Sequence, residues 1–202
     1  MGLFDKLKKQ AADAAGKAAK SAGNNDAQAA KKPAGGGSES IAFSVIPTTQ
    51  AEFAALPQAQ MQTPYDTAAM FVLALNIYTQ NPNESIAMMN FLKGSNPLSA
   101  KELQMLKTEM GQAGKGDYLA RSYFAGAAPQ NDYTPSQPYT VAVSDNPYSY
   151  DNDGYAKLYI ACGGADNPRP ITLRQAKDGK WYLWEQFLLT GIKKAESSNP
   201  WA

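Results

Sequence analysis

The pattern of hydrophobic and polar positions changes twice along this 202-residue chain. In residues 1–20, apolar side chains recur at helical spacing. Residues 21–38 are mainly Ala, Gly, Ser and Asn, and such a composition buries too little to offset the entropy of ordering, which predicts a flexible linker. From residue 39 onward, helical and strand periods alternate with turn signals, which predicts a globular domain over residues 39–202.

The first 20 residues predict a basic amphipathic helix. At about 100° per residue, the large apolar side chains share one face and most lysines lie opposite. The expected contact residues are Leu3, Phe4, Leu7, Lys6 and Lys9. This segment is expected to bind either an anionic membrane surface or a protein partner. A solvated tail that binds nothing is the third interpretation.

The first half of the globular part predicts a short strand followed by helices. Residues 41–46 contain enough β-branched side chains to predict the strand. Thr49 and Glu52 form a capping box that opens a helix through about residue 62, in which Pro57 predicts a kink or an early end. Residues 65–78 are the most apolar stretch of the chain and predict the central buried helix.

Two more helices are expected before the pattern changes. Asn83 can cap the first of them, which Gly94 closes. Ser99 and Glu102 form a second capping box. The buried stripe of the helix that follows is expected to hold Leu103, Leu106 and Met110.

After Gly116 the helical period gives way to a strand period. Residues 118–124 fit a last helical turn or a strand, and residues 125–138 read as a loop. Four strands are expected, over residues 139–143, 155–162, 171–177 and 180–186. The last two flank Asp178-Gly179, a strong hairpin signal. In the last strand, alternation places Trp184 and Gln186 on the same face.

Helices followed by neighbouring strands favour an α+β fold, in which an N-terminal helical layer packs on a C-terminal antiparallel sheet. Hydrophobic residues make up 44% of the chain, which is enough for a core. The same order of elements is compatible with a cystatin-like or nuclear-transport-factor-like cone.

Charge is distributed unevenly along the chain. Residues 1–32 contain seven lysines and three aspartates, whereas the remainder carries 12 basic and 15 acidic side chains. Because the excess of basic residues belongs to the tail, we expect no nucleic-acid binding by the domain. A single cysteine gives no internal disulfide, and no apolar run suits a secretory signal or a membrane span. The expected location is the cytoplasm, with the tail allowing attachment to the inner membrane face.

The residue types of common catalytic and metal sites are scarce. The chain has no histidine, which excludes Ser-His-Asp and Cys-His arrangements. Cys162 ends an apolar strand and is interpreted as a packing residue. The acidic loop 145–154 lacks EF-hand ligands at both ends, so a turn explains it better than calcium. We therefore expect no enzyme, no metal and no cofactor.

Aromatic residues supply the remaining candidates for recognition. Tyr148 and Tyr150 belong to a tyrosine-rich loop, Trp184 lies in the last expected strand, and Trp201 is close to the end of the sequence. Exposed aromatic side chains suit recognition surfaces. Half-buried edge tyrosines and tryptophans packed in the core are the alternative interpretation.

Several stretches of the globular part form a characteristic set. They are Pro64-Tyr-Asp-Thr-Ala-Ala69, Leu98-Ser-x-x-Glu102, Arg169-Pro-Ile-Thr-Leu-Arg174 leading into Asp178-Gly-Lys-Trp181, and Leu189-Thr-Gly-Ile192 with Asn199-Pro-Trp201. With them, residues 40–202 resemble a family of bacterial domains of unknown function. The resemblance implies a compact bacterial domain and brings no activity and no functional residues.

These observations predict a non-enzymatic binding or interaction module that its N-terminal helix attaches to a membrane surface or a partner protein. One alternative is a cone-like ligand-binding domain with cryptic enzymatic activity, which predicts a deep pocket with buried Asp or Arg of perturbed pKa. The other is a structural or cargo protein whose tail is a docking tag.

Overall fold

The computed structural model describes residues 36–112 and 115–198 of the chain. The expected amphipathic helix with its contact residues Leu3, Phe4, Leu7, Lys6 and Lys9 lies outside these residues, as do most of the expected linker and Trp201. All the elements below belong to the unit that spans Ala34–Ala202.

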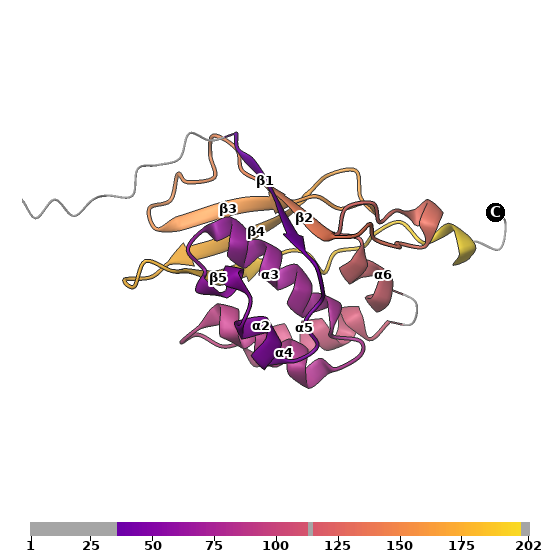
Figure 1. Cartoon of the computed structure of the whole chain (residues 1–202), viewed down its shortest axis with the longest axis horizontal. Coiled ribbons are helices and arrows are strands. Elements are labelled where there is room, and N and C mark those ends of the chain that lie inside the picture. Colours follow the sequence, from indigo (N-terminus) through magenta and orange to yellow (C-terminus); the bar gives the residue numbers. More distant parts are fainter. Residues whose placement is uncertain (1–35, 113–114, 199–202) are drawn as a thin grey trace, which may run out of the picture. The chain divides into compact units, whose positions relative to one another are not determined.

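An antiparallel sheet forms one layer of the described domain (Figure 1). Its strands lie side by side in chain order: β1 (Ser38–Phe43), β2 (Tyr139–Ser144), β3 (Tyr155–Ile160), β4 (Arg169–Gln175) and β5 (Trp181–Gln186). Strands β4 and β5 join through the expected Asp178-Gly179 turn, where Gly179 has φ +81°. The α+β fold class is therefore confirmed.

Strand β1 comes from the N-terminal part of the domain but pairs with β2, so that Ile41 lies opposite Val141. The strand expected over residues 41–46 begins and ends three residues earlier, at Ser38–Phe43. This displacement matters for the architecture, because one edge of the otherwise C-terminal sheet is supplied by a segment that precedes every helix of the described domain.

The helices form the second layer (Figure 1). They are α2 (Gln50–Ala54), α3 (Pro64–Asn76), α4 (Pro82–Lys93), α5 (Ala100–Met110) and α6 (Gly116–Arg121), with short 3-10 turns η1 (Pro57–Gln60), η2 (Pro129–Asn131) and η3 (Glu196–Ser198). Helix α3 is the expected central helix; it is buried along most of its length and contacts each strand of the sheet.

Two expectations about the helices were wrong in detail. The capping box at Thr49 is present, but α2 ends at Ala54 rather than near residue 62. Leu56 is extended (φ −66°, ψ 144°) because a residue before proline avoids helical angles, and Pro57 then starts η1. Asn81, not Asn83, caps α4, since Pro82 occupies the first helical position, where its missing N–H costs nothing.

The expectations for the next two helices were closer. Ser99 and Glu102 form the expected capping box of α5, and Leu106 and Met110 are buried, although Leu103 is only half-buried. Residues 118–124 resolve into the end of α6, followed by an isolated bridge between Phe124 and Val141.

The core lies between the sheet and α3. Side chains alternate along the strands, so that Val141, Leu158, Ile171 and Leu173 are fully buried on the helix-facing side. In the residues that the structure describes, no helix is both long and apolar enough to cross a membrane.

Asp145 fixes the start of β1 to the rest of the domain. Its carboxylate accepts hydrogen bonds from the backbone N–H of Gly36 (2.7 Å), the backbone N–H of Gly37 and the Tyr65 hydroxyl (2.9 Å). Burial, together with the neighbouring Tyr150 and Asp145, raises the pKa of Tyr65, which keeps its hydroxyl protonated as a donor.

Candidate functional site

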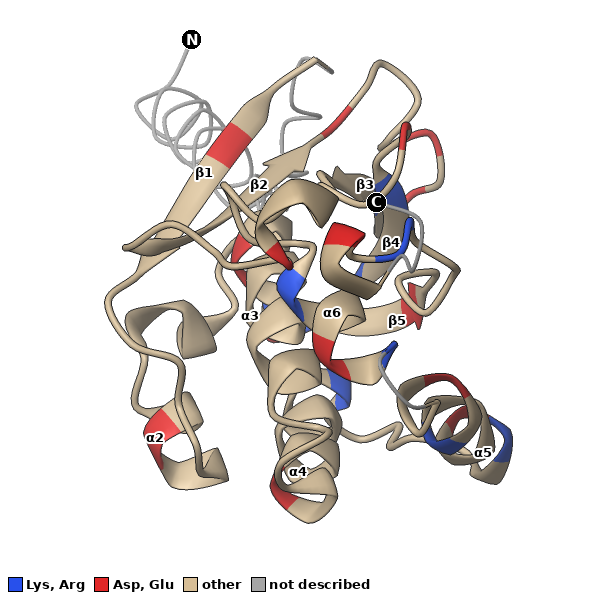
Figure 2. Ribbon diagram, turned by 90° about the vertical axis from the view of Figure 1, so that its right-hand side faces the viewer, with Lys and Arg blue, Asp and Glu red and all other residues tan. Residues whose placement is uncertain are grey.

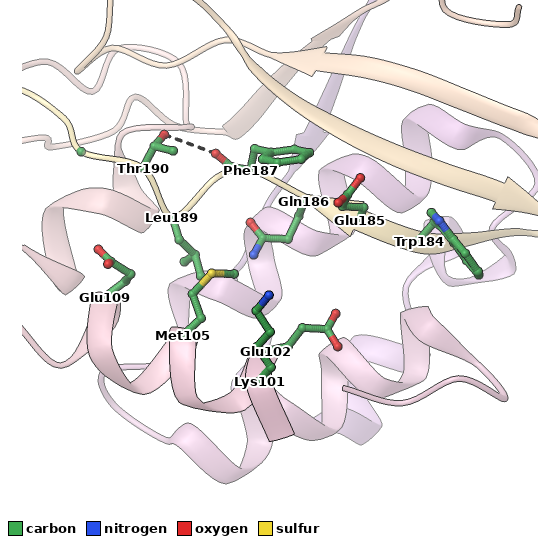
Figure 3. A pocket seen from close by; sticks show the side chains of 11 residues that line it. Lys101, Glu102, Met105, Glu109, Trp184, Glu185, Gln186, Phe187, Leu189 and Thr190 are labelled. Carbon is green, nitrogen blue, oxygen red and sulfur yellow. Dashed lines mark hydrogen bonds between the residues drawn. The ribbon is translucent and has the colours of Figure 1, made fainter. Parts of the chain in front are cut away.

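A groove with a volume of about 700 Å³ lies between α5 and the chain from Trp184 to Gly191 (Figure 3). The helix contributes Lys101, Glu102, Met105 and Glu109. The opposite wall is formed by the end of β5 and the segment that follows it, with Trp184, Glu185, Gln186, Phe187, Leu189, Thr190 and Gly191. The volume falls in the range of ligand pockets, about 300–1,000 Å³.

The spacing of residues along α5 produces one wall of this groove. Lys101, Met105 and Glu109 are four residues apart, so they project from the same face of the helix. Leu106 and Met110 project from a different face, into the core. Helix α5 therefore uses one apolar stripe for folding and presents a second stripe to the groove, on which Lys101 is basic and Glu109 acidic. Figure 2 shows residues of both charges along α5.

Exposed apolar side chains gather at the groove. Among the described residues, five large hydrophobic side chains are exposed, and three of them line it: Met105 (39% exposed), Trp184 (40%) and Phe187 (44%). Elsewhere in the described domain, only Val45 and Tyr148 among the large hydrophobic residues are exposed. Exposed apolar residues that line a cavity are typical of interaction sites.

An irregularity in β5 sets the position of Trp184. Glu185 pairs with Thr172 and Leu183 pairs with Leu173, so Trp184 is an extra residue without a partner in β4. A β-bulge of this type re-aims a side chain. The Trp184 ring makes an edge contact with Tyr155, with ring centroids 5.7 Å apart.

The bulge also corrects an expectation from the sequence. Strict alternation placed Trp184 and Gln186 on one face of the strand. In the structure, the Trp184 ring lies 4.9 Å from the guanidinium of Arg174, on the side of the sheet away from the helices. Gln186 pairs with the buried Ile171 and points toward α5 (Figure 3). The extra residue shifts the alternation by one position.

The side chains of the groove differ in whether their charges are paired. Glu102 accepts a hydrogen bond from the Lys93 ammonium (2.8 Å), and Lys93 is buried, with 3% of its side chain exposed. Burial raises the pKa of Glu102, but the hydrogen bonds from Lys93 and Ser99 outweigh it and hold the pKa below the ordinary value. Glu109 is paired with Lys115.

Two donors in the groove have no acceptor among the described residues. Lys101 extends from α5 into the groove, and Gln186 extends toward it from β5 (Figure 3). The Gln186 Oε1 atom accepts from the backbone N–H of Leu188 (2.8 Å), which leaves Nε2 as the free end of the amide. Within residues 36–112 and 115–198, no acceptor lies within hydrogen-bond distance of Lys101 Nζ or Gln186 Nε2.

The model of a known protein family matches residues 45–196. The family is described as a domain of unknown function, DUF6935. The chain belongs to this family. The match confirms the expected domain-of-unknown-function family, and it contains both walls of the groove. No curated protein and no solved structure matches the chain.

Of the expected recognition residues that the structure describes, the DUF6935 domain brings Trp184 to the groove, and not Tyr148 or Tyr150. Tyr148 is 77% exposed in the loop between β2 and β3 and does not line the groove. Tyr150 is half-buried and packs against the core, where its hydroxyl is buried. Met105 and Phe187 were missed; the one available signal was that Met105 falls outside the buried stripe of α5.

The lone thiol of the DUF6935 domain is held by packing and by one polar contact. Cys162 is half-buried, and its sulfur lies 3.3 Å from the Ser122 hydroxyl. Among the described residues, no group of three or more His, Cys, Asp and Glu side chains is placed to hold a metal ion.

Proposed function

We propose that this DUF6935 domain is a non-enzymatic interaction module that binds a polypeptide in the groove between α5 and β5. The observation that carries the proposal is a cavity of about 700 Å³ whose lining includes three exposed large apolar residues: Met105, Phe187 and, at the margin where its ring turns to the other face of the sheet, Trp184. Aromatic residues and methionine are enriched at the centres of protein interfaces, and methionine adapts to different partners.

The distribution of charge supports recognition rather than catalysis. Two of the three groove carboxylates, Glu102 and Glu109, are each engaged by a lysine. Glu102 also accepts from Ser99 as part of the α5 capping box, so its lowered pKa has a structural cause. Charged side chains around an apolar centre form the polar rim that is typical of binding sites.

The alternative of a cryptic enzyme requires a pocket with an available acid or base. Asp145 is the buried carboxylate of the described domain, and it is occupied by Gly36, Gly37 and Tyr65. An acid that accepts three hydrogen bonds at a strand start serves the fold, which favours the interaction module over the enzyme.

The proposal is tested by selecting binders for the full-length chain from a random nine-residue peptide library displayed on phage. The affinities of enriched peptides are then measured by fluorescence polarisation against wild type and the double variant Met105→Gln/Phe187→Gln. Both side chains are partly exposed, so the fold is retained. The matched control is Val45→Gln, which changes an exposed apolar residue (61% exposed) outside the groove.

We expect the groove variant to weaken peptide binding at least tenfold, and Val45→Gln to leave it unchanged. The proposal is overturned if no peptide is enriched, or if enriched peptides bind the groove variant and wild type equally well.

The sequence of residues 1–20 supports a second part of the function, attachment of the module to an anionic membrane surface or a protein partner. This part is independent of the groove and is tested separately.

A further inference from the structure

The edge of β5 allows the groove's occupant to be described further, on the basis of the proposed function. We infer that the occupant is an extended peptide segment that pairs with β5 as an additional strand and places an Asp or Glu side chain against Lys101 and Gln186. Strand addition to an exposed sheet edge is a recurring mode of peptide recognition.

Strand β5 stands at one end of the strand order in the described domain. The outward backbone groups at its start are covered: the N–H of Trp181 donates to the Met61 carbonyl (2.9 Å), and its C=O accepts from the Thr67 hydroxyl (2.7 Å). In an antiparallel ladder, every second residue points its N–H and C=O away from the paired strand. Leu183 is therefore the next residue whose backbone groups point to the free side.

Beyond the bulge at Trp184, the same alternation applies to Gln186. Phe187 donates its N–H to the Pro170 carbonyl of β4 (3.1 Å), so the backbone of its neighbour Gln186 points to the free side. Among the described residues, no side chain or backbone group bonds to the outward N–H and C=O of Leu183 or Gln186. The covered part of the edge thus ends where the groove begins.

The side chains beside this edge dictate the chemistry of the added strand. A residue opposite Gln186 projects toward α5, where the Lys101 ammonium and the Gln186 amide N–H lack an acceptor within the part of the chain that the structure describes. A carboxylate satisfies both donors with charge-assisted hydrogen bonds. The groove's own carboxylates do not compete: Glu102 is held by Lys93 and Glu109 by Lys115. Glu185 points away from Lys101, on the opposite side of the strand from Gln186 (Figure 3).

The same face of the added strand requires an apolar side chain next to the carboxylate. Met105 and Leu189 lie across the groove from each other, beside the Lys101 and Gln186 pair (Figure 3). Residues two positions apart in a strand share a face. The expected occupant therefore has an acidic residue and a large apolar residue at positions i and i+2.

The experiment is a parallel selection from the same phage library by two full-length proteins, wild type and Lys101→Glu. Lys101 is exposed and forms no ion pair with other described residues, so reversing its charge spares the fold. Wild type is expected to enrich Asp or Glu two positions from an apolar residue. Lys101→Glu is expected to enrich Lys or Arg at that position, and each pool should bind its own protein at least tenfold tighter than the other.

A backbone N-methyl scan of the best wild-type peptide tests the strand. Methylation blocks amides that face β5 and leaves the others free, so the loss of affinity should alternate with a period of two and reach at least tenfold at the facing positions. The matched control is the same scan on a peptide whose affinity for the Met105→Gln/Phe187→Gln variant equals its affinity for wild type.

The outcomes separate this inference from the proposed function. The added strand is overturned if peptide binding depends on Met105 and Phe187 but wild type and Lys101→Glu enrich the same sequences. It is also overturned if the N-methyl scan shows no period of two. In both cases the groove remains the binding site. Anchors spaced three and four residues apart identify a helical occupant and also overturn it. Concentration-dependent dimerisation that Met105→Gln abolishes identifies a second copy of the chain as the occupant and counts against it equally.

Discussion

Replacing Glu102 by Gln should destabilise the domain far more than its partly exposed position suggests. Glu102 is the partner of Lys93, whose side chain is 3% exposed and whose ammonium lies 2.8 Å from the carboxylate. The variant keeps the shape of the side chain but leaves a buried ammonium without a counter-charge. Glutamine can also complete a capping box, so the α5 cap to Ser99 is retained.

The magnitude follows from the burial of the two partners. Removing one partner of a fully buried pair costs about 3–5 kcal/mol. Glu102 is 34% exposed, so water can reach the ammonium in part. We therefore expect the free energy of unfolding to fall by about 2–3 kcal/mol. Urea denaturation at pH 7, followed by tryptophan fluorescence and far-UV circular dichroism, measures this change.

Two controls isolate the charge pair. Glu52→Gln changes the same position of the capping box of α2, where the carboxylate accepts only from Thr48 and Thr49, and should leave stability nearly unchanged. Lys93→Met added to Glu102→Gln removes the buried charge and keeps an apolar side chain of similar length, so it should recover stability. The reasoning is refuted if Glu102→Gln costs no more than Glu52→Gln, or if Lys93→Met brings no recovery.

The pH dependence gives an independent check of the same pair. Hydrogen bonds from Lys93 and Ser99 outweigh burial and lower the pKa of Glu102 below 4.5, its ordinary value. A carboxyl whose pKa is lower in the folded state stabilises the protein above its unfolded pKa and loses this contribution as the pH falls through the folded value. The advantage of wild type over Glu102→Gln should thus be constant above pH 4.5 and shrink below it.

Three further predictions concern the rest of the chain. Asp145→Ala removes the acceptor shared by Tyr65 and the two glycines before β1, so it should lower the free energy of unfolding by about 1–3 kcal/mol. Amide hydrogen exchange should become faster in β1 before the other strands, and equal protection from exchange across the sheet would contradict this. Gly94→Ala should cost more than 1 kcal/mol in thermal unfolding, because its φ is +60° and the new Cβ would lie 2.6 Å from the Tyr182 ring; an unchanged midpoint would contradict it. Full-length chain, but not a variant lacking residues 1–35, should float with anionic liposomes at low salt and be released by high salt, whereas flotation of neither would dismiss a membrane role for the tail.

Local signals were enough to place most elements. The capping boxes at Thr49 and Ser99, the apolar stretch that became α3 and the Asp178-Gly179 hairpin depend on neighbours a few residues apart, so the sequence contains the information directly. The errors at Pro57 and Pro82 arose where proline geometry competed with helical periodicity.

The site was harder to predict, because its residues come from segments that meet only in the fold. Trp184 was identified as a candidate because aromatic side chains suit recognition surfaces. Phe187 carries no local signal, and Met105 only the weak one that it falls outside the buried stripe of α5, since their place in the groove is set by where α5 packs relative to β5. Gln186 was assigned to the wrong face because a bulge follows from pairing with β4 and not from the alternation of β5 itself.

The sequence by itself determined the fold class, the central helix, the hairpin and the family, because period, composition and turn chemistry are properties of contiguous residues. Only the tertiary structure decided that β1 pairs with β2 across almost 100 residues, that β5 is left as an edge, and that α5 stands beside that edge with a groove between them. Pairing and packing join positions distant in the chain, and periodicity records which face of a segment is buried but not which segment buries it.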